Sequence, residues 1–369
     1  MIIGLLKEPG YETRISLLPD AVAHLTKKGI QVLVQQDAGL LSYATNQDYS
    51  GAGASITNRE EVLSSSNIIL VINTLEIDEI RLLKSKVLIG VYQPLTESFD
   101  LSLWAQQGIT VFSLDMLPRT TRAQSMDVLS SQANIAGYKA VLLAASTYSR
   151  YLPMFMTAAG SIIPAKFLII GAGVAGLQAI ATAKRLGAVI EVFDTRPAVK
   201  EEVMSLGGKF IEVEGAADAS KAGGYAVEQT EEFFLKQKEK IAATIAKSDI
   251  VITTAQIPGK KAPLLITTEM VHSMRNGSII IDLAASTGGN SAFTKNNETI
   301  VEKGVTIIGN SNLQATMPSD ASKLYGKNIL NFLQLIISKE NALNLNWDDD
   351  LVKGSCIVHN GEIVHDRLK

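Results

Sequence analysis

Short apolar runs alternate with amphipathic stretches along most of this 369-residue chain. In the N-terminal part, the apolar runs predict strands at residues 2–6, 31–34, 67–73, 87–92 and 110–114. The stretches between them predict helices at residues 17–28, 59–65, 76–84 and 100–107. Regular alternation of strand and helix predicts a mainly parallel sheet that is covered by helices on both faces.

A second series of the same kind begins at Lys166. Its predicted strands are residues 166–170, 189–194, 249–253, 278–282 and 305–308. Its predicted helices are residues 174–187, 197–206, 233–246 and 267–274. We therefore predict an α/β protein with two Rossmann-like domains and mainly parallel sheets, joined by long helices, with a cleft between the domains.

Two longer helical patterns connect the two series. Residues 126–150 are apolar at helical spacing, and a second helix is predicted over 319–338, with Pro318-Ser319-Asp320 at its N-cap. We expect this second helix to carry the chain back, which gives a discontinuous first domain of residues 1–132 plus 317–369 and a second domain of residues 133–316. Near the C-terminus, Asn360-Gly361 separates two alternating runs and predicts a two-residue hairpin.

The composition narrows the class of protein. The formal net charge is −3, so no strong field favours nucleic acid or anionic lipid as a partner. Only 19% of residues are charged, and the uncharged stretches 151–165 and 167–183 approach the ~20 residues of a spanning helix. Their prolines and glycines favour a buried strand followed by a buried helix, and we expect a soluble chain. Charge appears already at Lys7, too early for a secretory signal.

Cysteine and histidine usage bears on metal and redox chemistry. A single cysteine, Cys356, excludes an internal disulfide framework and suits a reducing compartment. The four histidines show no metal-ligand spacing, so no metal centre is expected.

The strongest single motif is Gly171-Ala-Gly173-Val-Ala-Gly176, which follows an apolar strand and opens a helical pattern. In a dinucleotide-binding fold these glycines allow a tight turn, close approach of a pyrophosphate and close packing of helix on strand. The next predicted strand ends at Asp194, near the ~20-residue spacing of the acid that binds a ribose diol. Such an acid favours NAD over NADP, whereas Arg196 argues the other way. The alternative is a βαβ crossover with packing glycines and a capping aspartate.

Two polar segments are further candidates. Residues 212–232 form a long loop rich in Gly, Ala, Ser and acids, with Tyr225 beside Gly223-Gly224, and we interpret it as a lid rather than an inserted disordered segment. Residues 117–131 gather Arg119, Arg122, an amide, a carboxylate and hydroxyls before the first connecting helix. In the alternative, Ser125 or Asp127 caps that helix and the arginines lie in solvent.

Three segments together carry a resemblance to a known family: the glycine loop, AGGYA and RAQSMDVLSSQANIAGYKAV. The chain resembles the NAD(H)-binding component of proton-translocating nicotinamide nucleotide transhydrogenase. The likeness runs from KEPGYETRISLLPDAV to DASKLYGKN and covers essentially the whole chain. It implies direct hydride transfer between NAD(H) on this chain and NADP(H) on a partner component. It also implies a membrane-spanning proton-channel component, a homodimer, and a cytoplasmic bacterial location at the inner membrane through these partners.

The resemblance assigns roles to individual residues. Those that match the nicotinamide, ribose and pyrophosphate contacts are Arg119, Gln124, Asp127 and Ser130, with Gln124 reaching toward the NADP(H) component. Those that match pyrophosphate, adenosine-side and mobile-loop contacts are Val174, Asp194, Thr195, Arg196, Gly224 and Tyr225. We add Arg122 and the motif glycines Gly171, Gly173 and Gly176 to the expected cofactor-binding set. Gln256 falls at a family contact position where an apolar residue is expected, which leaves its role open.

The family is also similar to alanine dehydrogenase, and this enzyme is the alternative function. It needs Lys and His in the first domain to bind a carboxylate and to move a proton. Lys7 and Arg14 remain here, but INTLEIDEI has no lysine, IGVYQPLT has no histidine, and His24 is expected to be structural. A non-catalytic NAD-sensing module is a further alternative.

Overall fold

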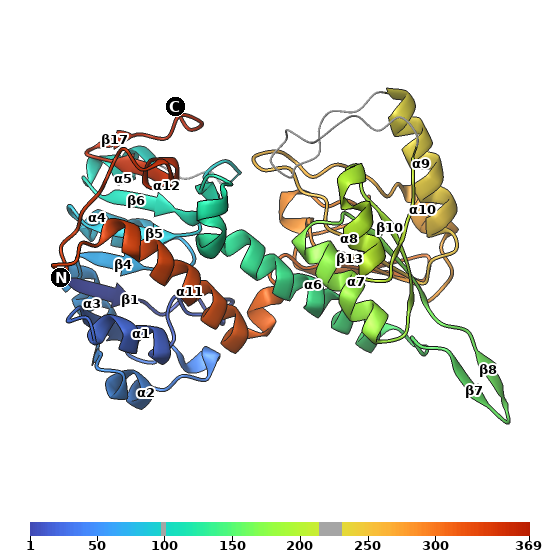
Figure 1. The fold of residues 1–369 in the computed structure, drawn as a ribbon, viewed down its shortest axis with the longest axis horizontal. Helices are drawn as coiled ribbons and strands as arrows, with labels where there is room; N and C mark the ends of the chain where they lie inside the picture. The colour runs from blue at the N-terminus through green and yellow to red at the C-terminus, as the bar shows by residue number, and fades with distance from the viewer. Residues whose placement is uncertain (97–100, 214–230) are drawn as a thin grey trace. The chain divides into compact units, whose positions relative to one another are not determined.

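The computed structural model describes residues 1–96, 101–213 and 231–369 (Figure 1). The chain divides into two compact units, one of Met1–Gln132 with Ala315–Lys369, the other of Ala133–Gln314. Helix α6 (Val128–Thr147) begins within the first unit and ends within the second. None of the helices in the described ranges is both long and apolar enough to cross a membrane.

The first unit is built on an eight-stranded sheet with the order β17-β16-β6-β5-β4-β1-β2-β3. Its parallel strands are β1 (Ile2–Leu5), β2 (Gln31–Gln35), β3 (Ser55–Thr57), β4 (Ile68–Leu70), β5 (Val87–Gly90) and β6 (Thr110–Ser113). The predicted C-terminal hairpin is present as β16 (Cys356–His359) and β17 (Glu362–Ile363), with both turn residues at positive φ. It also joins this sheet, because β16 pairs antiparallel with β6.

Helices cover both faces of this sheet, and alternate residues of a strand enter different cores. Ile68 and Leu70 of β4 belong to one hydrophobic cluster with α1 (Pro19–Thr26) and α11 (Pro318–Ile336). Ile69 belongs to another with α3 (Arg59–Ser65), α4 (Ile77–Leu82) and α5 (Leu101–Gln106). The remaining α-helices of the unit are α2 (Asn46–Gly51) and α12 (Asp350–Ser355).

The N-cap predicted for α11 is wrong by a few residues. The helix starts at Pro318, its N-cap is Met317, and the cap residue makes no side-chain hydrogen bond. Proline suits this first helical position because its missing N–H is not needed there and its φ is already helical. Ser319 and Asp320 therefore lie inside the first turn.

The second unit contains a seven-stranded sheet with the order β11-β10-β9-β12-β13-β15-β14. Its parallel strands are β9 (Lys166–Ile170), β10 (Val189–Phe193), β11 (Lys209–Phe210), β12 (Ile250–Thr253), β13 (Ile279–Asp282) and β15 (Val305–Gly309), and β14 (Glu298–Glu302) is antiparallel. Its other helices are α7 (Val174–Arg185), α8 (Lys200–Ser205), α9 (Glu231–Ile245) and α10 (Thr268–Ser273). The helix predicted over 197–206 is split into a 3₁₀ turn (Pro197–Val199) and α8.

The buried strand and buried helix expected in the uncharged region are present as β9 and α7, whereas residues 151–165, for which no strand was predicted, form an exposed element. This stretch forms a two-stranded hairpin of β7 (Phe155–Thr157) and β8 (Gly160–Ile162), in which Met156 is 75% exposed and Phe155 46% exposed. Pro153 and Pro164 bracket the stretch, and Gly160 turns the chain at φ 133°. These residues make a hairpin in spite of an apolar composition that is typical of a core strand.

Candidate functional site

The glycine loop follows β9 and leads into α7, as the motif predicts. Gly171 has φ 99°, and a Cβ there would lie 2.4 Å from Thr254 Oγ1. A Cβ on Gly176 would lie 1.9 Å from the carbonyl oxygen of Gly171, so helix and loop pack too closely for a side chain. A Cβ on Gly173, by contrast, would meet no atom of the described part of the chain within 4 Å. The open side of the loop is thus at the glycine that lets a pyrophosphate approach the backbone in this fold.

The start of α7 is arranged to receive an anion. Its N-cap is Gly173, and none of the described side chains caps the helix, so the first-turn N–H groups keep their donor capacity. Val174, the first helical residue, is 39% exposed. Gly137 of α6 packs against this turn, since a Cβ there would lie 2.1 Å from the carbonyl oxygen of Ala175. The residues present therefore fit a dinucleotide pyrophosphate.

The loop lies at the switch point of the second sheet. The order of the parallel strands reverses at β9, which lies between β10 and β12, and ligands of such sheets bind outside the carboxyl ends of the strands at this place. The loops that follow β9 and β12 are linked directly, because Thr254 N donates to Ile170 O (2.9 Å) and Thr254 Oγ1 donates to Gly171 O (3.1 Å).

Asp194 lies at the end of β10, but its carboxylate is already fully engaged. Its Oδ1 accepts from Arg196 N (2.8 Å) and Nε (2.9 Å), and its Oδ2 accepts from Ala172 N (2.7 Å) and Arg196 Nη2 (2.8 Å). A carboxylate offers about four acceptor positions, so ribose hydroxyls would have to replace guanidinium hydrogen bonds. The hydrogen bonds that the Arg196 guanidinium donates to Asp194 also raise the pKa of Arg196.

The other expected contacts of the second unit are placed less tightly. Thr195 is half-buried between Asp194 and Arg196, and the Gln256 amide donates to Leu283 O (3.0 Å) from an exposed position. Gly224 and Tyr225 lie outside the described residues, as does most of the predicted lid 212–232.

Sequence reasoning missed two buried polar residues that brace the loop after β12. Asp282, at the end of β13, accepts from Asn290 N (2.6 Å) and Thr294 Oγ1 (2.6 Å). Asn290 in turn donates to Ala255 O and Pro263 O, both at 2.9 Å. A carboxylate at the end of the apolar run IIID was the available signal.

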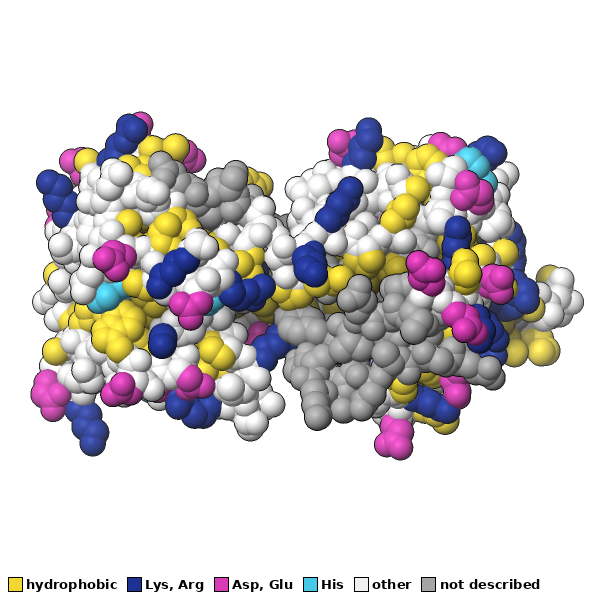
Figure 2. Space-filling view, turned by 90° about the horizontal axis from the view of Figure 1, so that it is seen from above, with side chains coloured by type: hydrophobic (Ala, Val, Ile, Leu, Met, Phe, Trp, Pro, Cys, Tyr) yellow, Lys and Arg dark blue, Asp and Glu magenta, His cyan; other side chains and the backbone are white. Residues whose placement is uncertain are grey.

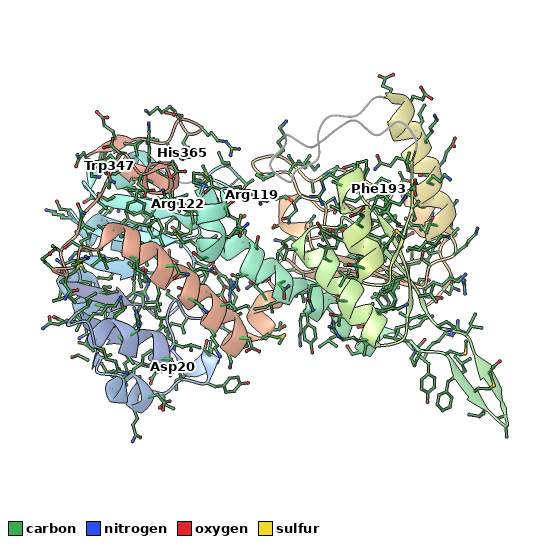
Figure 3. All side chains as sticks on the ribbon, in the orientation of Figure 1. Asp20, Arg119, Arg122, Phe193, Trp347 and His365 are labelled. Atoms are coloured by element: carbon green, nitrogen blue, oxygen red, sulfur yellow. The ribbon has the colours of Figure 1, made fainter. Side chains whose placement is uncertain are left out.

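The polar segment of the first unit is a 3₁₀ helix, η3 (Thr121–Met126), followed by α6 (Figure 3). Asp127 caps α6, because its Oδ1 accepts from Ser130 N (2.9 Å) and its Oδ2 from Ser130 Oγ (2.6 Å). Gln124 is exposed, and its side-chain amide makes no hydrogen bond to any described residue. Arg119 is exposed as well.

Arg122 was expected among the cofactor-binding residues, and in the structure it pairs with two acids at the start of α12. Its guanidinium contacts Asp349 Oδ2 (2.5 Å) and Asp350 Oδ1 (3.3 Å), and it is 56% exposed. This pairing ties the polar segment to the C-terminal part of the unit, where Asp349 also caps α12. Arg122 is thus paired with two acids of its own unit, and its role in cofactor binding stays a prediction.

The switch point of the first sheet carries buried acids. Glu8, after β1, is 7% exposed and accepts from Ile72 N (2.6 Å) and Asn73 Nδ2 (3.0 Å). Burial raises its pKa to about 7. Arg14 makes a bidentate pair with Glu12, with Nε to Oε1 at 2.8 Å and Nη2 to Oε2 at 2.6 Å.

These contacts bear on the alanine dehydrogenase alternative. Arg14, a candidate for binding a substrate carboxylate, already holds the Glu12 carboxylate. Lys7 is exposed, and His24 lies exposed in the last turn of α1 rather than in the core. In the described ranges, no group of three His, Cys, Asp or Glu residues could hold a metal ion. Acidic and basic side chains are interspersed on the face shown in Figure 2.

Comparison with known proteins defines the class. Residues 4–136 match the family model "Alanine dehydrogenase/PNT, N-terminal domain", and residues 140–366 match "Alanine dehydrogenase/PNT, C-terminal domain". The chain therefore belongs to the alanine dehydrogenase/PNT family. The predicted fold class and the resemblance are both confirmed.

Within this family the likeness to transhydrogenase is strong. The chain is 44% identical to the first part of the NAD(P) transhydrogenase alpha subunit of Rhodospirillum rubrum, over 100% of this chain and 99% of the relative. The crystal structure of transhydrogenase from Sinorhizobium meliloti superimposes with a TM-score of 0.90 at 43% identity, covering 99% of this chain and 100% of that one. An L-alanine dehydrogenase structure shares the fold, with a TM-score of 0.84 at 23% identity over 100% of this chain and 98% of that one.

Proposed function

We propose that this chain is the NAD(H)-binding subunit of a proton-translocating transhydrogenase and that it exchanges hydride directly with NADP(H) on a partner component. The observation that carries the proposal is the glycine loop at the switch point of the second unit. It is open at Gly173 and leads into an uncapped helix. The full-length identity to a transhydrogenase subunit supports the same function.

The second unit supplies the nucleotide-binding groups. The N–H groups at the start of α7 would hold the pyrophosphate, and the helix dipole favours its negative charge. Asp194 would accept hydrogen bonds from the adenosine ribose, with the Arg196 guanidinium moving off the carboxylate. A carboxylate at that place repels a 2′-phosphate, so NAD(H) is the expected ligand and NADP(H) belongs to the partner.

The first unit supplies positioning groups for the reaction. A bound nicotinamide provides the hydride at its C4 atom, and no proton moves at that carbon. Arg119, Gln124 and Asp127 therefore need to orient the ring and keep water away rather than act as acid or base. The amide of Gln124 is exposed and makes no hydrogen bond within the described residues, which suits a contact with the partner's nucleotide. Ser130 donates to Asp127, so its hydroxyl lies next to this carboxylate.

The proposal requires partners. Transfer needs an NADP(H)-binding component, and coupling to proton movement needs a membrane-spanning component. We place the chain on the cytoplasmic face of the membrane through these partners. We also propose a homodimer, which the exposed apolar hairpin β7–β8 supports, because exposed apolar surface often marks a protein interface.

One experiment separates this function from the alternatives. The purified chain is mixed with a transhydrogenase NADP(H)-binding component, and NADPH-dependent reduction of an NAD analogue is followed. Separate reactions contain alanine with NAD, or pyruvate and ammonia with NADH. Transfer with the partner alone supports the proposal. Turnover of alanine would establish an alanine dehydrogenase, and nucleotide binding without either reaction would favour a sensing module.

A further inference from the structure

Two asparagines of α11 bind one backbone carbonyl in the segment that carries Gln124. Asn328 Nδ2 donates to Ser125 O at 2.8 Å, and Asn331 Nδ2 donates to the same oxygen at 2.9 Å. The asparagines are three residues apart and thus neighbours on one face of the helix. Both lone pairs of the Ser125 carbonyl are therefore used by side chains from a distant part of the sequence.

The side-chain oxygen of Asn328 is also held by a hydrogen bond. Its Oδ1 accepts from Ser131 Oγ (2.7 Å), so the orientation of its amide group is determined by both partners. Gln132 Nε2 lies 3.4 Å from the same Ser131 Oγ, and Arg14 Nη1 donates to Gln132 Oε1 (2.8 Å). Asn328, Gln132 and Arg14 are each less than 10% exposed. A buried network thus links the Ser125 carbonyl to the interior of the first unit.

This network matters because it holds the backbone of η3, whose side chains are anchored separately by the Arg122 pairing and by buried Ala123 and Met126. The element η3 is a six-residue 3₁₀ helix whose N-cap, Thr120, makes no side-chain hydrogen bond. Such helices have poorer hydrogen-bond geometry than α-helices. Gln124 immediately precedes Ser125 in the chain. The position of its side chain therefore depends on how firmly that peptide group is held.

We propose that Asn328 and Asn331 are positioning residues for hydride transfer, which fix the Ser125 carbonyl and thereby the backbone from which Gln124 reaches the partner's nucleotide. This inference rests on the proposed function of Gln124. The asparagines act through the backbone and do not touch the nucleotide. Their loss should lower the rate of transfer more than the affinity for NADH.

The test uses Asn331, because it is partly exposed and its substitution should disturb the core less than that of buried Asn328. Asn331→Ala removes one donor, Asn331→Gln keeps an NH₂ donor on a longer side chain, and Gln334→Ala on the exposed side of α11 is the matched control. Hydrogen exchange of residues 121–127 and single-turnover transfer to the NADP(H) component are measured. Loss of a hydrogen bond, worth about 1 kcal/mol, predicts about fivefold faster exchange in Asn331→Ala.

We expect transfer by Asn331→Ala to fall by about tenfold, with the NADH dissociation constant within about twofold of wild type. Asn331→Gln should recover part of the rate, and Gln334→Ala should match wild type in both measurements. If hydrogen exchange of residues 121–127 is unchanged in Asn331→Ala, the asparagines do not fix the Ser125 carbonyl, and the proposal is overturned. Faster exchange with an unchanged transfer rate, or a rate loss explained entirely by weaker NADH binding, would overturn the positioning role. Absence of hydride transfer in the wild-type chain would instead refute the proposed function. The hydrogen-exchange data would still show whether the asparagines hold the backbone of residues 121–127.

Discussion

The buried carboxyl group of Glu8 makes the stability of the first unit depend on pH near neutrality. Burial is the largest cause of its raised pKa, about 7 against an ordinary value of 4.5, and the nearby Glu12 raises it further. Hydrogen bonds from Ile72 and Asn73 act in the opposite direction and do not offset the burial. Arg14 is paired with Glu12, and the buried phenols of Tyr92 and Tyr325 are uncharged at this pH.

The sign and size of the effect follow from linkage. Because the folded pKa exceeds the unfolded one, the folded protein binds the proton more tightly. The stabilisation is fully present below about pH 4.5 and is lost as the pH rises through 7. One pKa unit corresponds to about 1.4 kcal/mol, so wild type should lose about 2 to 3 kcal/mol of unfolding free energy between pH 5 and pH 8 from this group.

The assay compares wild type with Glu8→Gln in urea at pH 5 and pH 8. Both tryptophans, Trp104 and Trp347, belong to the first unit, so their fluorescence reports its unfolding. Glutamine cannot titrate, and the hydrogen bonds that it loses are lost equally at both pH values. The difference between the two proteins should therefore shift by about 2 to 3 kcal/mol in favour of Glu8→Gln at pH 8.

An exposed carboxylate provides the control. Glu60 lies in the first turn of α3 and is exposed, so Glu60→Gln should follow wild type at both pH values to within about 0.5 kcal/mol. If Glu8→Gln shows the same pH dependence as wild type, Glu8 does not titrate near neutrality, and the reasoning from its burial is refuted.

Further predictions concern the glycine loop, the reaction and the cysteine. Gly176→Ala should lower the melting temperature by several degrees, because its Cβ would lie 1.9 Å from the Gly171 carbonyl oxygen; an unchanged melting curve would contradict this packing. Gly173→Ala should melt like wild type but bind NADH at least about tenfold more weakly in a fluorescence titration, since its Cβ enters the open phosphate side; wild-type affinity would place the pyrophosphate elsewhere. Gln124→Asn should slow single-turnover transfer by at least about tenfold at nearly constant NADH affinity, whereas loss of affinity alone would make Gln124 a binding residue. Cys356 is fully buried with its pKa raised to about 12, so a disulfide reagent should modify it only after urea unfolding, and rapid native labelling would count against this.

Much of the fold could be predicted from local pattern. The strand over 166–170 and the hairpin turn at Asn360-Gly361 have the residues that their local geometry demands, and both are present. Elements with weak patterns were missed, such as β3, three residues long at the sheet edge. The exposed hairpin β7–β8 was also missed, because its short apolar strands carry no alternation of apolar and polar residues that would mark them.

The candidate site likewise contains features that the local sequence predicts and contacts that it does not. The glycine motif is local in sequence, and its geometry follows from the strand and helix on either side. The partners of Arg122 and Ser125 lie more than 200 residues away, on α12 and α11, so nothing near them in the sequence indicates these contacts. Asp194 and Arg196 are two residues apart, so their pairing is local in sequence. The sequence does not indicate whether the Asp194 carboxylate binds this guanidinium or a ribose, because that depends on whether a nucleotide is bound.

The measurement that tests the central claim most directly follows the transferred atom. NADH that carries deuterium at the transferred C4 position is bound to this chain, mixed with the NADP⁺-loaded partner component, and the NADPH product is analysed by mass spectrometry. Direct transfer predicts that the deuterium is found in NADPH, with none released to water, and that Gln124→Asn slows its arrival. Deuterium lost to solvent, or NADPH that remains unlabelled, would contradict direct hydride transfer by this chain.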